Sequence, residues 1–307
     1  MGDEVALNSF YVVTGGLLII FNLPFVISIL KHDALRRRKE YVIFAGLASG
    51  DVLSGLSTLI AGAYRLYLFN TNQENLMIRR HECAYRTMIF SITAITVQAF
   101  LIFAVSVDRF IAVTYPIKYR NLTPRYSYSV IGACYAITLV FNIAGVASSA
   151  SSGDQLISAS CVGSATVEEW FFTLWYEGRV LLVAASAVLY AFVAIKFTHR
   201  SSQSAGPSTT TSANEGRIAI QRRVTLTVGI NVIFTVILYI IPATAVIIVR
   251  HTSGNLDLLS PIAWLLNCVN TIINFFVFIY RHQDLRDGVR YLFLCKPLPP
   301  TSLSGRR

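Results

Sequence analysis

Long apolar runs separated by short polar segments dominate the sequence. Seven of these runs contain about 20 residues or more, which is the length that a helix needs to cross a bilayer. They are residues 10–30, 42–66, 86–113, 128–149, 171–196, 224–249 and 258–280. We therefore predict an all-α membrane protein, a seven-transmembrane helix bundle in which residues 10–280 follow an extracellular tail of residues 1–9.

The segment after the last run has a different pattern. In "RHQDLRDGVRYLFLC" the apolar residues Leu285, Val289 and Leu292 fall on one helical face, and Arg286 and Arg290 fall elsewhere. This pattern is typical of a short amphipathic helix at a membrane surface. Residues 281–307 are thus predicted to be a cytoplasmic amphipathic helix and tail. Cys295 follows the helix and is a candidate for S-palmitoylation, with an unmodified surface cysteine as the alternative.

The composition agrees with a membrane protein and gives its orientation. Charged residues make up 14% of the chain, against about 25% in soluble domains. Four segments hold 20 of the 26 Lys and Arg residues, namely "KHDALRRRKE", 109–125, 196–223 and 281–307. By the positive-inside rule these segments are cytoplasmic and the N-terminus is outside, in a multi-pass protein of the plasma membrane. The net charge of +10 then reflects topology and attraction to the lipid bilayer, and nucleic acid is not needed as a partner.

Two of the five cysteines fall in the loops predicted to be extracellular. Cys83 and Cys161 flank the third and fourth spans, whereas Cys134 and Cys268 lie inside spans. Only the outer pair faces an oxidising compartment, so a Cys83–Cys161 disulfide is the simplest interpretation, with two free thiols as the alternative.

Polar residues inside the spans are few, and hydrocarbon offers them no hydrogen-bond partners. Asn267, Asn270 and Asn274 are spaced three and four apart and so share a helical face. Asp51 is the natural centre for such a group. Two interpretations stay open: a hydrogen-bonded cluster that only holds the bundle together, and a polar switch that holds a cation.

Several motifs carry a resemblance to a known family. "SVDRFIAVTYPIKYRN" resembles the Asp-Arg-Tyr region and following loop of rhodopsin-like (class A) G-protein-coupled receptors. "LASGD" resembles the Leu-Ala-x-x-Asp motif of their second span. "NTIINFFVFIYRHQDLR" is similar to their Asn-Pro-x-x-Tyr segment, with Phe275 and Phe278 replacing the proline and the tyrosine.

The resemblance implies roles for individual residues. Residues implied in G-protein coupling and switching are Asp108, Arg109, Phe110, Pro116, Tyr119, Asn274 and Phe278. A polar site able to hold a sodium ion is implied for Asn22, Asp51, Gln98, Asn270 and Asn274. No other cofactor or metal is expected.

The chain also departs from the family pattern. Tyr239-Ile240 replaces the Cys-Trp before Pro242, and no acidic residue stands at the start of the sixth span. Such departures resemble the nematode chemoreceptor families, and the serpentine type in particular. We expect a receptor that transmits binding of an extracellular ligand, a small molecule or a peptide, to a heterotrimeric G protein. A seven-span transporter or channel is the alternative, disfavoured because no internal repeat is visible. An enzyme is disfavoured because no catalytic constellation is apparent.

A ligand pocket is expected at the outer helix ends. Its candidate residues are Arg86, Phe90, Ser91, Ile95, Tyr176, Glu177, Arg179, Tyr239 and Trp264. Ser91 occupies the position where amine receptors carry an aspartate, so a biogenic amine is disfavoured. The charged residues Arg86, Glu177 and Arg179 either recognise a polar ligand or bind lipid headgroups.

Overall fold

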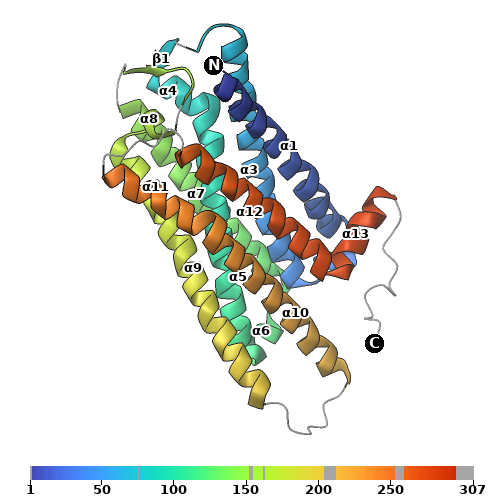
Figure 1. Ribbon diagram of the computed structural model, residues 1–307. Helices are drawn as coiled ribbons and strands as arrows, with labels where there is room; N and C mark the ends of the chain where they lie inside the picture. Colours follow the sequence, from blue (N-terminus) through green and yellow to red (C-terminus); the bar gives the residue numbers. More distant parts are fainter. Residues whose placement is uncertain are drawn as a thin grey trace. The chain divides into compact units, whose positions relative to one another are not determined.

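Helices make up nearly all of the structure. A computed structural model describes residues 2–74, 76–151, 155–161, 163–203, 212–252 and 259–294, without the side chains of 2–3, 198–203 and 212–222. The long helices are α1 (Gly2–Lys31), α3 (Lys39–Asn70), α5 (Ile89–Thr114), α7 (Pro124–Ser151), α9 (Glu169–Gln203), α10 (Ser212–Thr235), α11 (Ile241–His251) and α12 (Leu259–Arg281) (Figure 1). The short ones are α2 (Asp33–Arg36), α4 (Arg80–Cys83), α6 (Pro116–Asn121), α8 (Gly163–Thr166) and α13 (Gln283–Phe293).

In the described part of the chain, two single turns of π-helix interrupt longer helical segments. η1 (Ala84–Met88) joins α4 to α5, and η2 (Val236–Ile240) joins α10 to α11. Pro242 stands in the first turn of α11, where its missing N–H costs a hydrogen bond that the wider π-turn accommodates. The third span therefore runs continuously from Arg80 to Thr114, and the sixth from Arg223 to His251.

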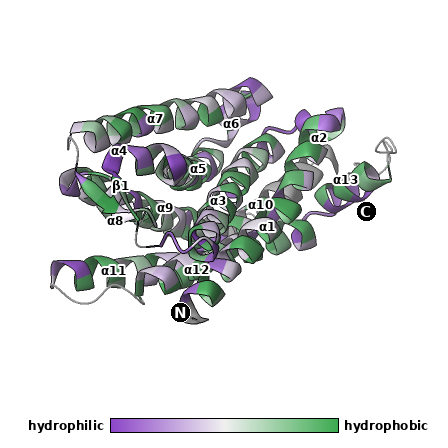
Figure 2. Cartoon of the chain, turned by 90° about the horizontal axis from the view of Figure 1, so that it is seen from above, coloured by the Kyte–Doolittle hydropathy of each residue, from purple (hydrophilic) through white to green (hydrophobic). Residues whose placement is uncertain are grey.

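Within the described residues, seven helical segments are long and apolar enough to cross a membrane. Most of their length is hydrophobic, and hydrophilic residues gather at helix ends, for example where α7 begins beside α6 (Figure 2). The short helix α13 follows the last span. The predicted fold class, seven spans and a short helix after them, is confirmed.

The first helix starts earlier than the hydrophobic pattern suggested. It begins at Gly2, within the segment predicted to be a tail. The side-chain amide of Asn8 donates a 2.9 Å hydrogen bond to the backbone carbonyl of Glu4, one turn earlier. Polar residues can therefore extend a helix beyond its apolar run, which a hydropathy window does not detect.

The chain divides into two compact units. Unit 1 comprises Met1–Leu23, Leu47–Leu101 and Ile131–Leu182, and unit 2 comprises Pro24–Gly46, Ile102–Val130 and Val183–Arg307. Helices α1, α3, α5, α7 and α9 each contribute a segment to both units.

In unit 1, α1 and α3 pack backbone against backbone through glycines. A Cβ on Gly15 would lie 2.6 Å from the carbonyl oxygen of Gly55, and a Cβ on Gly62 would lie 2.8 Å from that of Asn8. Small residues permit this close approach, which strengthens van der Waals packing between membrane helices.

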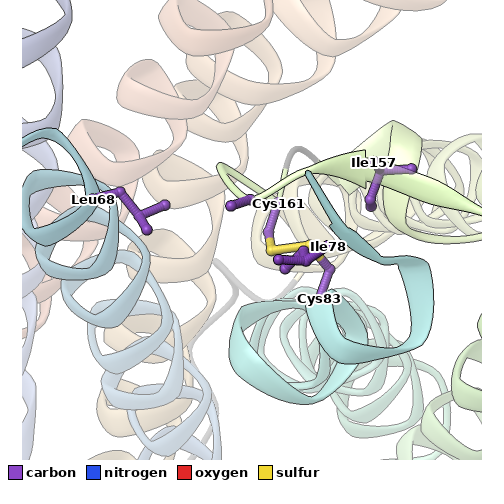
Figure 3. Close-up of a cluster of buried hydrophobic side chains, with 6 residues drawn as sticks. Leu68, Ile78, Cys83, Ile157 and Cys161 are labelled. Carbon is purple, nitrogen blue, oxygen red and sulfur yellow. A yellow bond between two sulfur atoms is a disulfide. The ribbon is translucent and has the colours of Figure 1, made fainter. Parts of the chain in front are cut away.

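In unit 1 a disulfide lies beside a small two-stranded antiparallel sheet, whose strands are far apart in the sequence. Strand β1 (Met77–Arg79) pairs antiparallel with β2 (Leu156–Ser158), with Ile78 opposite Ile157. Cys83 and Cys161 are joined, with their Cα atoms 5.4 Å apart, so the predicted disulfide is confirmed. Figure 3 shows Ile78 beside the sulfur atoms, in a buried group that also contains Leu68 and Ile157. The bond therefore ties the segment before α9 to the start of the third span.

In unit 2, α13 packs closely on the segment around α2. Leu285 is buried, and a Cβ on Gly288 would lie 2.6 Å from the Ser28 hydroxyl and 2.7 Å from Leu35 Cδ1. The carboxylate of Asp284 accepts hydrogen bonds from Arg38, at 2.7 Å, and from the Tyr41 hydroxyl, at 3.1 Å. These contacts fix the start of α13.

Candidate signalling site

Arg109 lies in unit 2 near the end of α5, and it is only 2% exposed. Its Nε atom donates to the carboxylate of Asp108 at 2.9 Å, and one Nη atom donates to the same oxygen. Among the described residues, the second Nη atom of Arg109 has no hydrogen-bond partner. The other carboxylate oxygen of Asp108 has none there either. Arg109 is thus neutralised locally but retains a donor for another partner.

Tyr119, in α6, is the second group that holds Arg109. Its hydroxyl accepts a 2.7 Å hydrogen bond from Arg109 and lies 3.2 Å from the Asp108 carboxylate and 3.4 Å from that of Glu40. Burial raises the pKa of the Tyr119 phenol, as do the neighbouring carboxylates. The phenol therefore stays protonated and can donate to a carboxylate while it accepts from Arg109.

Lys39 holds Tyr119 from the other side. Its ammonium lies 3.7 Å from the centre of the Tyr119 ring and donates to the backbone carbonyls of Tyr119 and Leu122, the latter at 3.2 Å. We call Lys39, Glu40, Asp108, Arg109 and Tyr119 the Arg109 cluster. It contains two cations and two carboxylates, so its charges balance.

Lys39 and Glu40 were missed by the sequence reasoning. They end the basic segment "KHDALRRRKE", which we interpreted only as an orientation signal. The available signal was the Glu40 carboxylate next to a span, beside a run of basic residues. The other implied residues of this region are half-buried: Phe110 follows Arg109 in α5, and Pro116 is the first residue of α6.

The polar residues predicted to form one sodium site belong to both units. In unit 1, Gln98 donates a 2.8 Å hydrogen bond to the buried carboxylate of Asp51, and the amide of Asn22 donates to the Leu18 carbonyl of its own helix. In unit 2, Asn270 donates to Thr235 at 3.3 Å, and Asn274 is buried. The Asp51–Gln98 contact agrees with a polar centre, and a sodium site remains a prediction.

The end of α12 carries an aromatic and hydroxyl network in unit 2. Phe278, which replaces the tyrosine of the family motif, is buried. The centre of its ring lies 4.5 Å from the centre of the Phe44 ring. His282 packs on the rings of Tyr41 and Phe44, and its Nε2 atom lies 3.2 Å from the Thr227 hydroxyl.

Thr227 connects α10 to this network. Its hydroxyl donates to the Arg223 carbonyl at 2.8 Å and accepts from Arg281 Nε at 3.1 Å. Burial lowers the pKa of His282 to about 4, helped by the neighbouring arginines. His282 is therefore neutral near pH 7 and can donate to Thr227, so this part of the sixth span is held without an acidic residue at the start of the span.

Most candidate pocket residues lie in unit 1. Arg86 is exposed and donates to the Tyr64 hydroxyl at 2.9 Å, and Ser91 is hydrogen-bonded to Ser57 at 2.9 Å. The Arg179 guanidinium stacks 4.2 Å from the centre of the Tyr176 ring. The other candidates in unit 1 are Phe90, which is exposed, Ile95, which is buried, and Glu177, which is half-buried. Two candidates belong to unit 2, namely Tyr239, which is buried, and Trp264, which is half-buried. Cys295 lies outside the described residues.

Comparison with known families decides the class of the protein. Residues 17–293 match the family model described as "Serpentine type 7TM GPCR chemoreceptor Srsx", from the first span to the end of α13. The chain belongs to this Srsx family of serpentine chemoreceptors. No curated protein matches the chain.

This Srsx receptor is therefore a G-protein-coupled chemosensory receptor, and the class A-like, serpentine interpretation of its sequence is confirmed. Family membership sets aside the transporter, channel and enzyme alternatives, because the family is one of receptors. In a receptor of this kind, ligand binding must be converted into a change of helix packing at the G-protein side.

Proposed function

We propose that the Arg109 cluster is the G-protein switch of this Srsx receptor. The observation that supports this proposal most strongly is that Arg109 is buried and hydrogen-bonded to Asp108 and Tyr119. One of its Nη atoms nevertheless has no hydrogen-bond partner among the described residues. Burying a charge is costly unless it is paired. This arrangement is suited to a closed state in which Arg109 is stored until a partner replaces Tyr119.

Opening requires Tyr119 to leave Arg109. Tyr119 belongs to α6 and is anchored by Lys39 of α3, so a movement of either element changes the contacts of Arg109. Once released, the planar guanidinium can donate to carbonyl or carboxylate groups of the G protein at two points. A ligand favours this state only by binding the open packing more tightly than the closed one.

We further propose that the receptor lies in the plasma membrane with its N-terminus outside the cell. The basic segments around Arg36–Lys39 and Arg120–Arg125 then face the cytoplasm, as the positive-inside rule requires. The Cys83–Cys161 disulfide then faces an oxidising compartment. An N-terminal epitope should bind antibody on intact cells, and a C-terminal epitope only after permeabilisation. The reverse pattern would contradict this orientation.

The ligand is a small molecule or a peptide and is not a biogenic amine. The Ser91 hydroxyl, at the position of the amine-binding aspartate, carries no charge and is bonded to Ser57. An aliphatic ammonium group would find no carboxylate at that position to pair with.

The switch is tested by Arg109→Lys, which keeps the positive charge but removes the planar fork. We expect nucleotide exchange on a panel of heterotrimeric G proteins to fall by about tenfold or more, which corresponds to about 1.4 kcal/mol. Arg120→Lys is the matched control, because Arg120 is exposed on α6, next to Tyr119 but outside the Arg109 cluster. Undiminished exchange in Arg109→Lys, at equal surface expression, would contradict the proposed role.

A further inference from the structure

A polar groove on unit 2 is lined by residues that are not part of the Arg109 cluster. It has a volume of about 410 Å³ and is lined by Asp33, Arg36, Arg37, Pro124 and Tyr128. Pockets that hold small ligands span about 300–1,000 Å³. The groove is therefore large enough for a headgroup that carries more than a single phosphate.

The groove is rich in positive charge. Arg36 is paired with Asp33 at 2.5 Å, whereas Arg37 has no carboxylate within ion-pair distance among the described residues. Both arginines are exposed. Pro124 begins α7, whose N-terminal end adds a partial positive charge to the groove. An anion entering the groove would meet a guanidinium that no acid in the described chain already occupies.

The groove lies beside the ends of two membrane-spanning helices, which is where lipid headgroups are expected. α1, the first span, ends at Lys31, two residues before Asp33, and α7, the fourth span, begins at Pro124. Tyr128 is 43% exposed one turn into α7, a position that suits the amphipathic ring of tyrosine at a membrane interface. At such a position the headgroups of an anionic leaflet would be present at a higher local concentration than a soluble anion.

We propose that this groove binds the headgroup of an anionic phospholipid of the phosphoinositide class. Arg36 and Arg37 contact its phosphates, since guanidinium groups bind phosphate at two points. The Tyr128 hydroxyl is available to hydrogen-bond the inositol ring. The lipid then holds α2 against the start of α7, close in sequence to Lys39 and Glu40 at the start of α3.

The test uses the full-length receptor, purified in detergent, and a fluorescent short-chain phosphatidylinositol bisphosphate. The double variant Arg36→Gln/Arg37→Gln should bind this lipid at least about tenfold more weakly, since both guanidinium contacts to its phosphates are lost. Arg286→Gln/Arg290→Gln is the control, because it removes the same charge from exposed positions on α13. The control should lose much less affinity.

Three results would overturn the proposal. Equal losses in the two double variants would mean diffuse attraction to positive charge, and an unchanged affinity in the groove variant would mean that the lipid binds elsewhere. Displacement of the lipid by an acidic peptide at lower concentration than by soluble inositol phosphate would assign the groove to a protein partner. Unfolding temperatures of all variants, measured in parallel, establish that the exposed substitutions leave the fold intact.

Discussion

At the scale of single residues, Arg109 shows how this receptor keeps a charge inside a membrane helix. The cost of burial is offset by Asp108 beside it and by Tyr119 from α6. The motif around Arg109 predicted Asp108 as a partner, and the family resemblance implied a role for Tyr119. The contact between Lys39 and Tyr119 could not be predicted, because it joins residues 80 positions apart in the sequence. Local patterns carry no information on such pairs.

His282 makes the stability of the receptor depend on pH. Its pKa is about 4 in the folded state, against 6.5 ordinarily, so the unfolded chain takes up a proton first as pH falls. This contribution to stability is complete above pH 6.5 and is lost between pH 6.5 and 4. We expect the folded state to lose about 2 kcal/mol between pH 7 and pH 5 from this group.

Thermal unfolding of the purified receptor at pH 7 and pH 5 measures this effect. His282→Gln should show a smaller decrease in unfolding temperature on acidification than the wild type. His251→Gln, which changes an exposed histidine, should keep the full decrease. The same decrease in wild type and His282→Gln would show that His282 does not remain neutral in the folded receptor.

At the scale of elements, the approach of α1 to α3 depends on glycine. A Cβ on Gly55 would lie 2.8 Å from the Gly15 carbonyl oxygen and 2.8 Å from Leu18 Cβ, and the backbone cannot yield cheaply. Overpacking of this kind costs about 1–3 kcal/mol. We therefore expect Gly55→Ala to lower the unfolding temperature and the yield of folded receptor.

Gly132→Ala provides the matched comparison. A Cβ at Gly132 meets no atom within 4 Å, so this change only improves helix propensity, by about 0.5–1 kcal/mol. Its unfolding temperature should be equal to or above that of the wild type. A Gly55→Ala receptor as stable as Gly132→Ala would mean that α1 and α3 are not in backbone contact.

Elements differ in how well the sequence predicts them. Apolar runs predicted the seven spans, because the requirement to cross a bilayer is local and strong. The amphipathic pattern around Leu285 likewise predicted a helix after the last span. The β1–β2 pairing and the two π-turns in the described residues were not predicted. Three-residue strands such as Met77–Arg79 have no clear periodicity, and their pairing depends on the distant Cys83–Cys161 bond.

At the scale of the whole molecule, the central claim is that the Arg109 cluster stabilises the closed state of the receptor. The start of the sixth span offers no carboxylate, because Gln221, Arg222 and Arg223 stand there. Closure must then depend on contacts such as that between Arg109 and Tyr119, and the bond between Thr227 and Arg281. Each bond contributes modestly, so the receptor should show partial basal activity.

Basal nucleotide exchange by Tyr119→Phe and Tyr115→Phe, at matched surface expression, tests this claim most directly. Tyr119→Phe keeps the ring over Lys39 and removes only the hydroxyl that accepts from Arg109. A hydrogen bond of about 1 kcal/mol corresponds to about a fivefold shift between two states, so we expect basal exchange to rise by up to about fivefold. Tyr115, which is 52% exposed, should tolerate the same change without effect. Equal basal exchange in Tyr119→Phe and the wild type would contradict a closed state held by this cluster.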